Sequence, residues 1–585
     1  MNKEIKICQN CKREFVIEPE DFQFYEKIKV PAPSWCPECR MIRRFLFRNE
    51  RGLYRRKDDR TGKEIFSGIP PQAPFKVYER EYWWSDAFDV MQYGQDYDFS
   101  RPFFAQFFEL MKTVPWPSRS ILRLVNSDYS NNASDLKNSY LCFNSGSIED
   151  SAYIINGTVV KDSFDLYHAR HTELSYDDYM VDESYQVFFS VNCEECHEIW
   201  FSRNLIGCQN CFGCVNLRNK SYHIFNKPVA KETYQKFIKD FERGSYRTIS
   251  EMRKKMQEFW KEHPMRFTLG INNVNCTGEH IEHSKNVRES YAIHEAENLK
   301  YCQMLEDKVT DSYDYTVWGN NVSLIYESCA IGEECSKMKF CSHCYPASHD
   351  VEYSAWCHSS SDLFGCVGLR KKQYCIFNKQ YSKEEYFKLR EKIIRHMNDI
   401  PYTDKQGRIY KYGEFFPPEF SPFAYNETIA QDFFPLTKGA ATEKGFLWRD
   451  PETREHATTI NAADLPDHIK DVSDSILKEI IKCADCGKAY RIIQSELQFY
   501  RRIGLPLPRF CVSCRFNERF KFVNPPKFWP KQCDCAGMKD KSGVYINGAK
   551  HSHGENSCPS EFKTSYSPEK HAIVYCETCY RSEVI

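Results

Sequence analysis

Cysteine pairs are the residues in this sequence whose type and spacing could do chemistry. Two sets of four share one arrangement, in which a Cys-x-x-Cys pair is followed at the same distance by another such pair. They are Cys8, Cys11, Cys36 and Cys39, and Cys483, Cys486, Cys511 and Cys514. Four thiolates in two tight turns suit tetrahedral zinc, and a site closed by four protein ligands is structural rather than catalytic.

The residues between the cysteine pairs repeat as well. FQFYEKIKVPAPSWCPECR (22–40) matches LQFYRRIGLPLPRFCVSCR (497–515) at Gln, Phe, Tyr, Ile, both prolines, both cysteines and the final Arg. A unit of roughly 40 residues cannot bury a sufficient core, so metal binding would supply its folding energy. The sequence therefore predicts two units of treble-clef or zinc-ribbon type.

A third metal site is predicted near the end of the sequence. Cys533 and Cys535 lie well before Cys576 and Cys579, and these four are the best ligand set. His551, His553 or Cys558 could replace one of them. The expected cofactor is Zn²⁺, as two to three structural ions.

A basic stretch follows the first cysteine unit, from Arg40 to Lys63, with a surplus of seven positive charges. If its first part is helical, arginines at three- and four-residue steps share one face and resemble a phosphate-tracking surface. The candidate nucleic-acid-binding residues are Arg40, Arg43, Arg44, Arg48, Arg51, Arg55 and Arg56, with Arg515, Arg519 and Lys521 in the later unit. The alternative is that these side chains pair with acidic surface elsewhere in the chain.

The middle of the chain is duplicated. FGCVNLRNKSYHIFNK (212–227) and FGCVGLRKKQYCIFNK (364–379) match at twelve of sixteen positions with an offset of 152. Ser139-Tyr140 aligns in the same way with Ser290-Tyr291. Two tandem copies of one unit are therefore expected, at roughly 126–243 and 272–400.

Within each copy a small residue followed by an aromatic recurs at short intervals. The aromatics are Tyr140, Tyr153, Phe164, Tyr176 and Tyr185 in the first copy, and Tyr291, Tyr301, Tyr313 and Tyr326 in the second. Short β-branched or aromatic segments broken by Asn, Asp, Ser and Gly indicate short strands with turns. Two such intervals would make one coil of a parallel β-solenoid, with roughly 22–24 residues in the coil, and an irregular antiparallel domain is the alternative.

A helix is predicted at the end of each copy. The two segments are 230–241 and 382–397, and the latter opens with a capping box. Such helices would cover the otherwise open ends of the solenoid.

Both copies carry an acidic flank. Ten acids face two bases between Lys161 and Glu198, and nine face two between Glu295 and Glu334. This flank would repel nucleic acid, but it could dock the chain's own basic stretch, a basic partner or cations, or simply be solvated. The copies also hold cysteines that we interpret as core residues because they align poorly between copies, with metal binding as the alternative since a Cys-x-x-Cys-x-x-Cys step resembles a metal site. They are Cys193, Cys196, Cys208, Cys211, Cys214, Cys335, Cys341, Cys344, Cys357 and Cys366.

The expected fold is mainly β with short helices, a multidomain chain in which zinc-ribbon-like units flank the duplicated solenoid-like repeat. The segments are a zinc ribbon with a basic helix (1–60), an aromatic-rich connecting domain (61–125), copy 1 with its helix (126–271), copy 2 with its helix (272–400), a Pro- and aromatic-rich connector (401–475), a second zinc ribbon (476–530) and a C-terminal zinc ribbon (531–585). In the connecting domain, a short helix is expected from Phe103 to Met111 after Pro102.

Composition restricts the class of protein. The 585 residues carry a formal charge of −1, so no global attraction to nucleic acid or membrane is expected. No apolar run opens the sequence and no stretch is apolar enough to span a bilayer, which favours a cytoplasmic protein. In a reducing compartment, 28 cysteines grouped as pairs indicate metal thiolates rather than disulfides.

The order of motifs resembles an uncharacterised family of bacterial zinc-ribbon proteins with a cysteine-rich repeat middle region. The resemblance is carried by EPEDFQFY, CPECRMIRRFLFRNER, YWWSD, FGCVNLRNKSYHIFNK and CETCYRSEV, and it covers almost the whole chain. It implies the architecture above but no activity.

The sequence predicts a non-enzymatic, zinc-binding scaffold or adaptor that contacts RNA, DNA or a ribonucleoprotein through its basic zinc-ribbon surfaces. The alternative is a protein-interaction module whose acidic solenoid captures a basic partner. An enzyme acting on polysaccharide is a third hypothesis, but no paired carboxylates, nucleophile elbow, phosphate loop or open metal site supports it. Nothing in the sequence selects an oligomeric state.

Overall fold

The computed structural model describes residues 2–450, 457–537, 547–554 and 556–584. The chain folds into two compact units, each discontinuous in sequence: Met1–Arg119, Thr268–Asp450 and Pro525–Phe528 form unit 1, and Ser120–Phe267, Pro451–Asn524 and Trp529–Ile585 form unit 2. Unit 1 therefore joins the N-terminal cysteine unit to the second repeat copy. Unit 2 joins the other cysteine units to the first copy.

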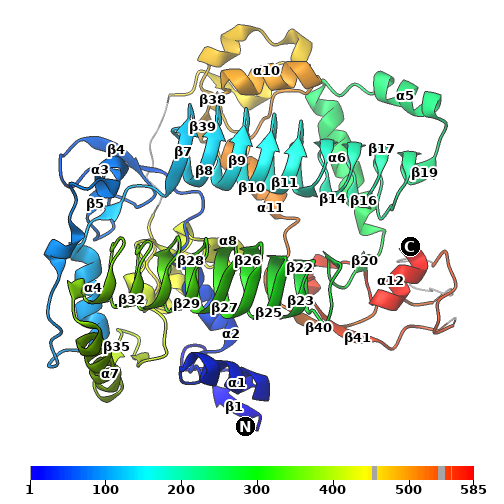
Figure 1. Ribbon diagram of the computed structural model, residues 1–585. Coiled ribbons are helices and arrows are strands. Elements are labelled where there is room, and N and C mark those ends of the chain that lie inside the picture. The colour runs from blue at the N-terminus through cyan, green and yellow to red at the C-terminus, as the bar shows by residue number, and fades with distance from the viewer. Residues whose placement is uncertain (1, 451–456, 538–546, 555, 585) are drawn as a thin grey trace. The chain divides into compact units, whose positions relative to one another are not determined.

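Each repeat copy forms a stack of parallel strands (Figure 1). In unit 2 the first stack consists of β7 (Ile121–Val125), β8 (Asn131–Lys137), β9 (Phe143–Glu149), β10 (Ala152–Lys161), β11 (Phe164–Glu173), β12 (Tyr176–Asp182), β13 (Tyr185–Phe188), β14 (Val191–Glu194), β15 (His197–Trp200), β16 (Arg203–Ile206), β17 (Gln209–Phe212) and β18 (Ser221–Ile224). The strand β19 (Lys227–Pro228) pairs antiparallel with β18 and ends this stack.

The second stack, in unit 1, follows the same plan. It consists of β21 (Gly270–Ile271), β22 (Gly278–Glu282), β23 (Lys285–Arg288), β24 (Ser290–His294), β25 (Ala296–Lys300), β26 (Gln303–Glu306), β27 (Val309–Gly319), β28 (Val322–Ile331), β29 (Ser336–Lys339), β30 (Ser342–Cys344), β31 (His349–Glu352), β32 (Ser361–Phe364), β33 (Gln373–Ile376) and the antiparallel β34 (Lys379–Gln380).

One layer of the first stack contains a single sequence interval, which corrects the expectation that two intervals make one coil. Ala152 pairs with Phe164, and Phe164 pairs with Tyr176. The small residue of each interval explains this spacing, because its hydroxyl accepts a hydrogen bond from a backbone N–H in the next layer. Ser163 N donates to Ser151 Oγ at 3.0 Å, and Ser175 N donates to Ser163 Oγ at 3.0 Å. Each interval in the sequence is therefore a whole layer.

The backbone of the first stack turns in steps of three residues. Every third residue from Asn132 to Phe225 has a positive φ between 44° and 64°, and only two of these residues are glycines. This conformation costs most residues roughly 1–2 kcal/mol, and Asn and Asp tolerate it best. Asn side chains at these turns also bond to the next layer, since Asn126 Nδ2 donates to Asn138 Oδ1 at 3.1 Å and Asn138 Nδ2 to Asp150 Oδ1 at 2.9 Å. Most Asn and Asp residues of the stack thus lie at its turn positions.

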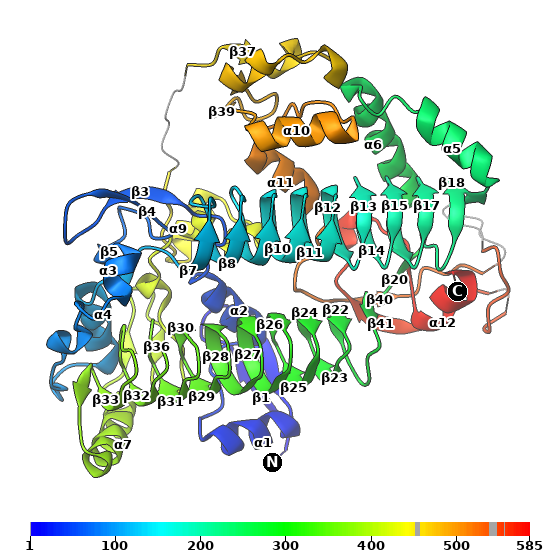
Figure 2. The same ribbon diagram turned by 45° about the horizontal axis from the view of Figure 1, so that its top comes forward.

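Helices cover the stacks at their ends and along one side (Figures 1 and 2). Unit 1 holds α1 (Pro19–Ile28), α2 (Pro37–Phe45), α3 (Arg80–Trp84), α4 (Phe103–Thr113), α7 (Lys383–Asp399), α8 (Ile429–Phe433) and α9 (Lys438–Glu443). Unit 2 holds α5 (Lys231–Asp240), α6 (Tyr246–Lys261), α10 (Gln494–Ile503), α11 (Val512–Phe520) and α12 (Glu577–Val584). No described helix is both long and apolar enough to cross a bilayer.

The helices expected from sequence are confirmed. The segment 230–241 is α5, and 382–397 is α7, which carries the expected capping box of Ser382 and Glu385. The helix expected after Pro102 is α4, whose Phe103 packs edge-on against Phe364 and Phe377 of the second stack. Phe237 of α5 packs edge-on against Phe212 of the first stack in the same way, so both stacks have an end covered by helical apolar side chains.

Short strand pairs complete the two units. In unit 1 these are β1 (Glu4–Ile7) with β2 (Glu14–Ile17), β3 (Tyr54–Lys57) with β4 (Glu64–Ser67), β5 (Val77–Tyr78) with β6 (Trp116–Pro117), and β35 (Tyr402–Thr403) with β36 (Ile409–Tyr410). In unit 2 they are β37 (Ile460–Asn461), β38 (Ile481–Lys482) and β39 (Ala489–Tyr490), then β40 (Trp529–Gln532) with β41 (Glu561–Thr564), and β20 (Met265–Arg266) with β42 (Val574–Tyr575).

Candidate metal centres and the helices they position

The first four-cysteine unit is built from the β1–β2 hairpin and the start of α2. Cys8 and Cys11 lie in the turn of the hairpin, which Lys12 closes with φ 61°. Cys36 is the N-cap of α2 and Cys39 lies in its first turn. The Cys36 N–H donates to Cys8 Sγ at 3.2 Å, so the helix start points at the hairpin sulfurs and favours thiolates there.

The second four-cysteine unit repeats this geometry with the same cysteine spacing. Cys483 and Cys486 lie between β38 and β39, and Cys511 is the N-cap of α11. The Cys511 N–H donates to Cys483 Sγ at 3.2 Å. Burial raises the pKa of Cys483, but backbone hydrogen bonds from Cys511, Cys486 and Asp485 outweigh it and lower that pKa to about 7. A thiolate is therefore accessible at neutral pH.

Sulfur separations test whether zinc fits these sites. Zn–S bonds of about 2.3 Å in a tetrahedron place the sulfurs about 3.8 Å apart, whereas a disulfide needs about 2.0 Å. Cys11 Sγ lies 3.7 Å from Cys36 Sγ, and Cys486 Sγ lies 3.6 Å from Cys511 Sγ. All four sulfurs of each set lie within 4.8 Å of one another. Both predicted sets thus fit a tetrahedral metal ion.

The C-terminal ligand set differs by one residue from the best set predicted from the sequence. The four sulfurs that converge are those of Cys533, Cys558, Cys576 and Cys579, and Cys558 Sγ lies 3.8 Å from Cys576 Sγ. Cys535 belongs instead to a neighbouring group with His551, His553 and Cys579. Cys558 has no Cys-x-x-Cys partner in the sequence, so spacing alone could only name it as an alternative.

Each cysteine unit positions an aromatic pair against a stack. Phe24 of α1 stacks on Tyr313 of the second stack, with ring centroids 3.9 Å apart. Phe499 of α10 lies in the corresponding place on Phe164 of the first stack at 4.6 Å. The repeated Gln-Phe-Tyr motif therefore contacts the repeated small-aromatic motif in both units.

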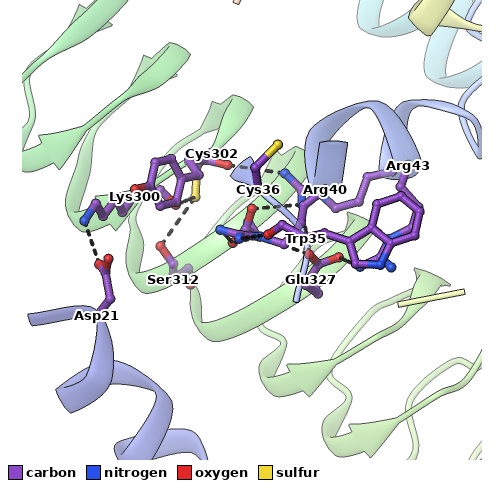
Figure 3. Close-up of polar contacts among 12 residues, drawn as sticks. Asp21, Trp35, Cys36, Arg40, Arg43, Lys300, Cys302, Ser312 and Glu327 are labelled. Atoms are coloured by element: carbon purple, nitrogen blue, oxygen red, sulfur yellow. Dashed lines mark hydrogen bonds and ion pairs between the residues drawn. The ribbon is translucent and has the colours of Figure 1, made fainter. Parts of the chain in front are cut away.

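The arginines of α2 pack against the second stack and pair with its carboxylates (Figure 3). Arg40 Nη2 lies 2.8 Å from Asp314 Oδ2, and Arg44 Nη1 lies 3.1 Å from Asp314 Oδ1. Arg43 bridges Glu327 at 3.2 Å and Glu414 at 3.0 Å. These three arginines and both stack carboxylates have side chains that are at most 1% exposed. Lys300 also reaches Asp21 of α1 at 2.6 Å.

Helix α11 makes equivalent contacts with the first stack. Arg515 Nη1 lies 2.5 Å from Asp165 Oδ2 and 3.0 Å from Glu496 Oε1 of α10. Arg519 pairs with Asp165 at 3.0 Å and with Asp177 at 2.9 Å. Asp165 and Asp314 are the aligned acids of the two repeat copies. Both stacks therefore receive two helix arginines on the same carboxylate.

These positions favour the alternative expectation, in which the arginines pair with acids of the same chain, over a phosphate-tracking surface. Seven of the ten candidate side chains are buried, and they are Arg40, Arg43, Arg44, Arg48, Arg56, Arg515 and Arg519. Arg48 pairs with Glu50 at 2.8 Å, and Arg56 with Asp59 at 2.9 Å. Arg51 is partly buried and pairs with Asp432, while Arg55 and Lys521 are exposed. The helix ends at Phe45, so only Arg40, Arg43 and Arg44 lie on it, and the expected shared face does not extend to Arg48, Arg51 or Arg55. The helix arginines meet buried acids instead.

The repeat cysteines lie in the cores of the stacks, as predicted. In the first stack Cys193, Cys196, Cys208, Cys211 and Cys214 share one apolar cluster with Val187 and Leu205. The five in the second stack are also buried. Among the described residues, none of these ten belongs to a four-donor group.

An open acidic groove lies on the second stack, where polar residues from four successive turns lie next to one another. Glu295, Asp307, Lys308, Asn320, Asn321, Glu333, Glu334 and Pro346 line a volume of about 590 Å³. Layers here contain an extra residue, since Val309 pairs with Val322. In three of these turns the extra residue gives two consecutive positive φ angles, such as 54° and 62° at Glu333 and Glu334.

Comparisons with known proteins add no assignment. No protein-family model matches the chain, and no curated protein matches it significantly. A solved structure from Desulfovibrio desulfuricans, provisionally named an acetyltransferase, aligns at 10% identity over 50% of this chain and 86% of its own, with a TM-score of 0.11. Similarity this weak carries no argument, and the resemblance to bacterial zinc-ribbon proteins stays an expectation.

Proposed function

We propose that the protein is a non-enzymatic scaffold in which zinc ribbons dock on each of two β-solenoids. An acidic groove on one solenoid binds a basic segment of a partner protein. The ribbons have structural roles in this proposal because each candidate metal has four protein ligands and no open coordination position. The helices α2 and α11, which begin at cysteines of the two four-cysteine units, are also the helices that pack against the stacks.

The observation that carries the proposal is the groove on the second stack. Its lining includes four carboxylates, from Glu295, Asp307, Glu333 and Glu334, against one ammonium group, from Lys308. All five residues are exposed, unlike Asp314 and Glu327 of the same stack, which pair with arginines of α2. Successive layers of a parallel stack are about 4.8 Å apart, so the groove presents charges along an extended path that suits a Lys- or Arg-rich peptide.

Electrostatic capture of this kind depends on salt. Exposed charges are screened over about 10 Å at 0.1 M ionic strength, so a groove of exposed carboxylates should bind tightly only at low salt. The alternative, contact with nucleic acid through the cysteine units, fits less well, because most arginines predicted for that role are buried in ion pairs.

The test is a fluorescence anisotropy titration of a labelled Lys/Arg-rich peptide with the full-length protein at low and high salt. The double change Glu333→Lys and Glu334→Lys should weaken peptide binding at least tenfold, whereas Glu232→Lys and Glu251→Lys, on exposed helix surface of unit 2, should change it less than threefold. Single-stranded RNA and duplex DNA are run in parallel. Tighter binding to either nucleic acid than to the peptide, or indifference to the Glu333/Glu334 change, would refute the proposal.

A further inference from the structure

A second group of donor atoms lies beside the C-terminal four-cysteine site. It consists of Cys535, His551, His553 and Cys579, whose donor atoms all lie within 4.8 Å of one another. Cys535 Sγ lies 3.1 Å from His551 Nδ1 and 3.4 Å from His553 Nε2. In tetrahedral zinc coordination, a sulfur ligand and a nitrogen ligand lie about 3.6 Å from one another. The two groups have Cys579 in common.

We propose that this second group binds its own zinc ion, and that the Cys579 thiolate bridges it to the ion held by Cys533, Cys558 and Cys576. The C-terminal unit then contains a two-metal cluster rather than one structural ion. A tetrahedral Cys₂His₂ set is a common structural zinc site.

The donor set is complete for such a cluster. Two tetrahedra that share one corner need seven donors, and the described residues supply five sulfurs and two imidazoles in this place. Charge favours sharing as well. One zinc ion with four thiolates carries a net charge of −2, whereas two zinc ions with five thiolates and two neutral imidazoles carry −1. All five cysteines are at most 7% exposed, and a smaller buried charge has a smaller desolvation cost.

Hydrogen bonds around the donors orient them for a metal. His551 Nε2 lies 3.0 Å from Glu583 Oε2, so this nitrogen carries the proton that the carboxylate accepts. In the neutral imidazole the Nδ1 lone pair then faces Cys535 Sγ, which is the arrangement of carboxylate, histidine and zinc found at metal sites. Asn547 Nδ2 donates to Cys535 Sγ at 3.2 Å and is itself held by the Tyr575 hydroxyl at 2.6 Å.

The cluster also explains how α12 is held against the first stack. Tyr580, the residue after the bridging Cys579, accepts a hydrogen bond from Asn204 Nδ2 at 2.7 Å and lies 3.3 Å from Asn216 Oδ1. Two metal ions on one thiolate would restrict the start of this helix and hence the position of Tyr580.

The experiment measures zinc per chain in the full-length protein by mass spectrometry of the metal. We expect four zinc ions per chain in the unaltered protein and three in His553→Ala, with four retained in the control His571→Ala, which changes an exposed histidine of the same unit. If His553→Ala loses more than one ion through unfolding, His553→Cys should restore four, since thiolate is also a zinc ligand. Failure to restore the fourth ion, or three ions in the unaltered protein, would overturn the proposal.

The bridge is tested by cadmium NMR on the ¹¹³Cd-substituted chain. Two ¹¹³Cd resonances should show mutual scalar coupling through the shared sulfur, and the coupling should disappear in His553→Ala while one of the two resonances remains. Four bound ions without any cadmium–cadmium coupling would show that Cys579 belongs to one metal alone, against the proposal.

Discussion

Arg40 and Asp314 form an ion pair of 2.8 Å in which neither side chain is more than 1% exposed. The arginine comes directly after the last cysteine of the first four-cysteine unit, and the aspartate lies in the second stack. Arg515 and Asp165 repeat this pair in unit 2. Buried charges of this kind are stable only when they are paired, so each cysteine unit and its stack depend on one another.

Removing one partner of this pair should destabilise unit 1. Arg40→Met leaves Asp314 and Glu327 short of a buried positive charge, and uncompensated charges of this type cost about 3–5 kcal/mol. The urea midpoint of unit 1, measured with zinc in excess, should therefore fall markedly. Arg55→Met, which changes an exposed side chain paired with Glu64 at 3.6 Å, should leave the midpoint nearly unchanged. Equal effects of the two substitutions would contradict the assigned role of Arg40.

The aromatic contact of α1 should contribute independently of charge. Phe24→Ala removes a 7% exposed ring that stacks on Tyr313, and comparable truncations cost about 3–5 kcal/mol. Calorimetry should show a melting temperature several degrees lower. Leu447→Ala, at a side chain that is 56% exposed in the same unit, serves as the control and should melt like the unaltered protein.

Metal binding should distinguish ligand cysteines from core cysteines. Cys11→Ser should lose one zinc ion per chain, because serine is a poor zinc ligand and the remaining three sulfurs cannot close the site. Cys142→Ser should keep the full zinc content, since Cys142 is buried in the first stack and its Sγ donates to the Tyr140 carbonyl at 3.7 Å. Zinc analysis of both variants measures this, and loss of zinc from Cys142→Ser would show that a repeat cysteine binds metal.

Two adjacent aspartates should affect stability with opposite signs. Burial raises the pKa of Asp178 well above its usual value, and its Oδ2 has no hydrogen-bond partner among the described residues. The folded chain therefore keeps a proton that the unfolded chain releases above pH of about 3.9, and stability falls by about 1.4 kcal/mol per pH unit until the folded pKa is reached. Asp178→Asn should remove this loss and raise the melting temperature at pH 8 but not at pH 4.

The matched variant is Asp177→Asn. Burial would raise the pKa of Asp177, but Arg253 and Arg519 outweigh it and lower that pKa. Its stabilising contribution is present above the pKa of an unfolded aspartate, about 3.9, and is lost as the pH falls through the lower folded value. Asp177→Asn should therefore melt at lower temperature at pH 7, with the difference shrinking below pH of about 4. A change in melting temperature of the same sign for both variants would exclude this assignment.

The sequence by itself predicted what depends on local spacing. The Cys-x-x-Cys pairs predicted two four-donor sets. Each pair holds its two sulfurs close together in a tight turn, so two pairs can supply four ligands to one metal ion whatever the conformation of the residues between them. The capping box at Ser382 predicted the start of α7, since that signal lies within one helical turn. The serine and aromatic intervals predicted short strands, but not how many intervals complete one layer. The number of intervals in a layer depends on which backbone N–H donates to each Ser hydroxyl. In the fold the donor lies one interval later in the sequence, as Ser163 N does for Ser151 Oγ.

Only the tertiary structure decided which repeated part contacts which. The N-terminal cysteine unit docks on the second stack and the later unit on the first, through Arg40 with Asp314 and Arg515 with Asp165. Both cysteine units carry the same motifs and both stacks carry the same acid, so either pairing satisfies the same chemistry in the sequence. Contacts between residues hundreds of positions apart choose between the pairings, and the burial of those charges, which separates a docking helix from a phosphate-binding one, exists only in the folded chain.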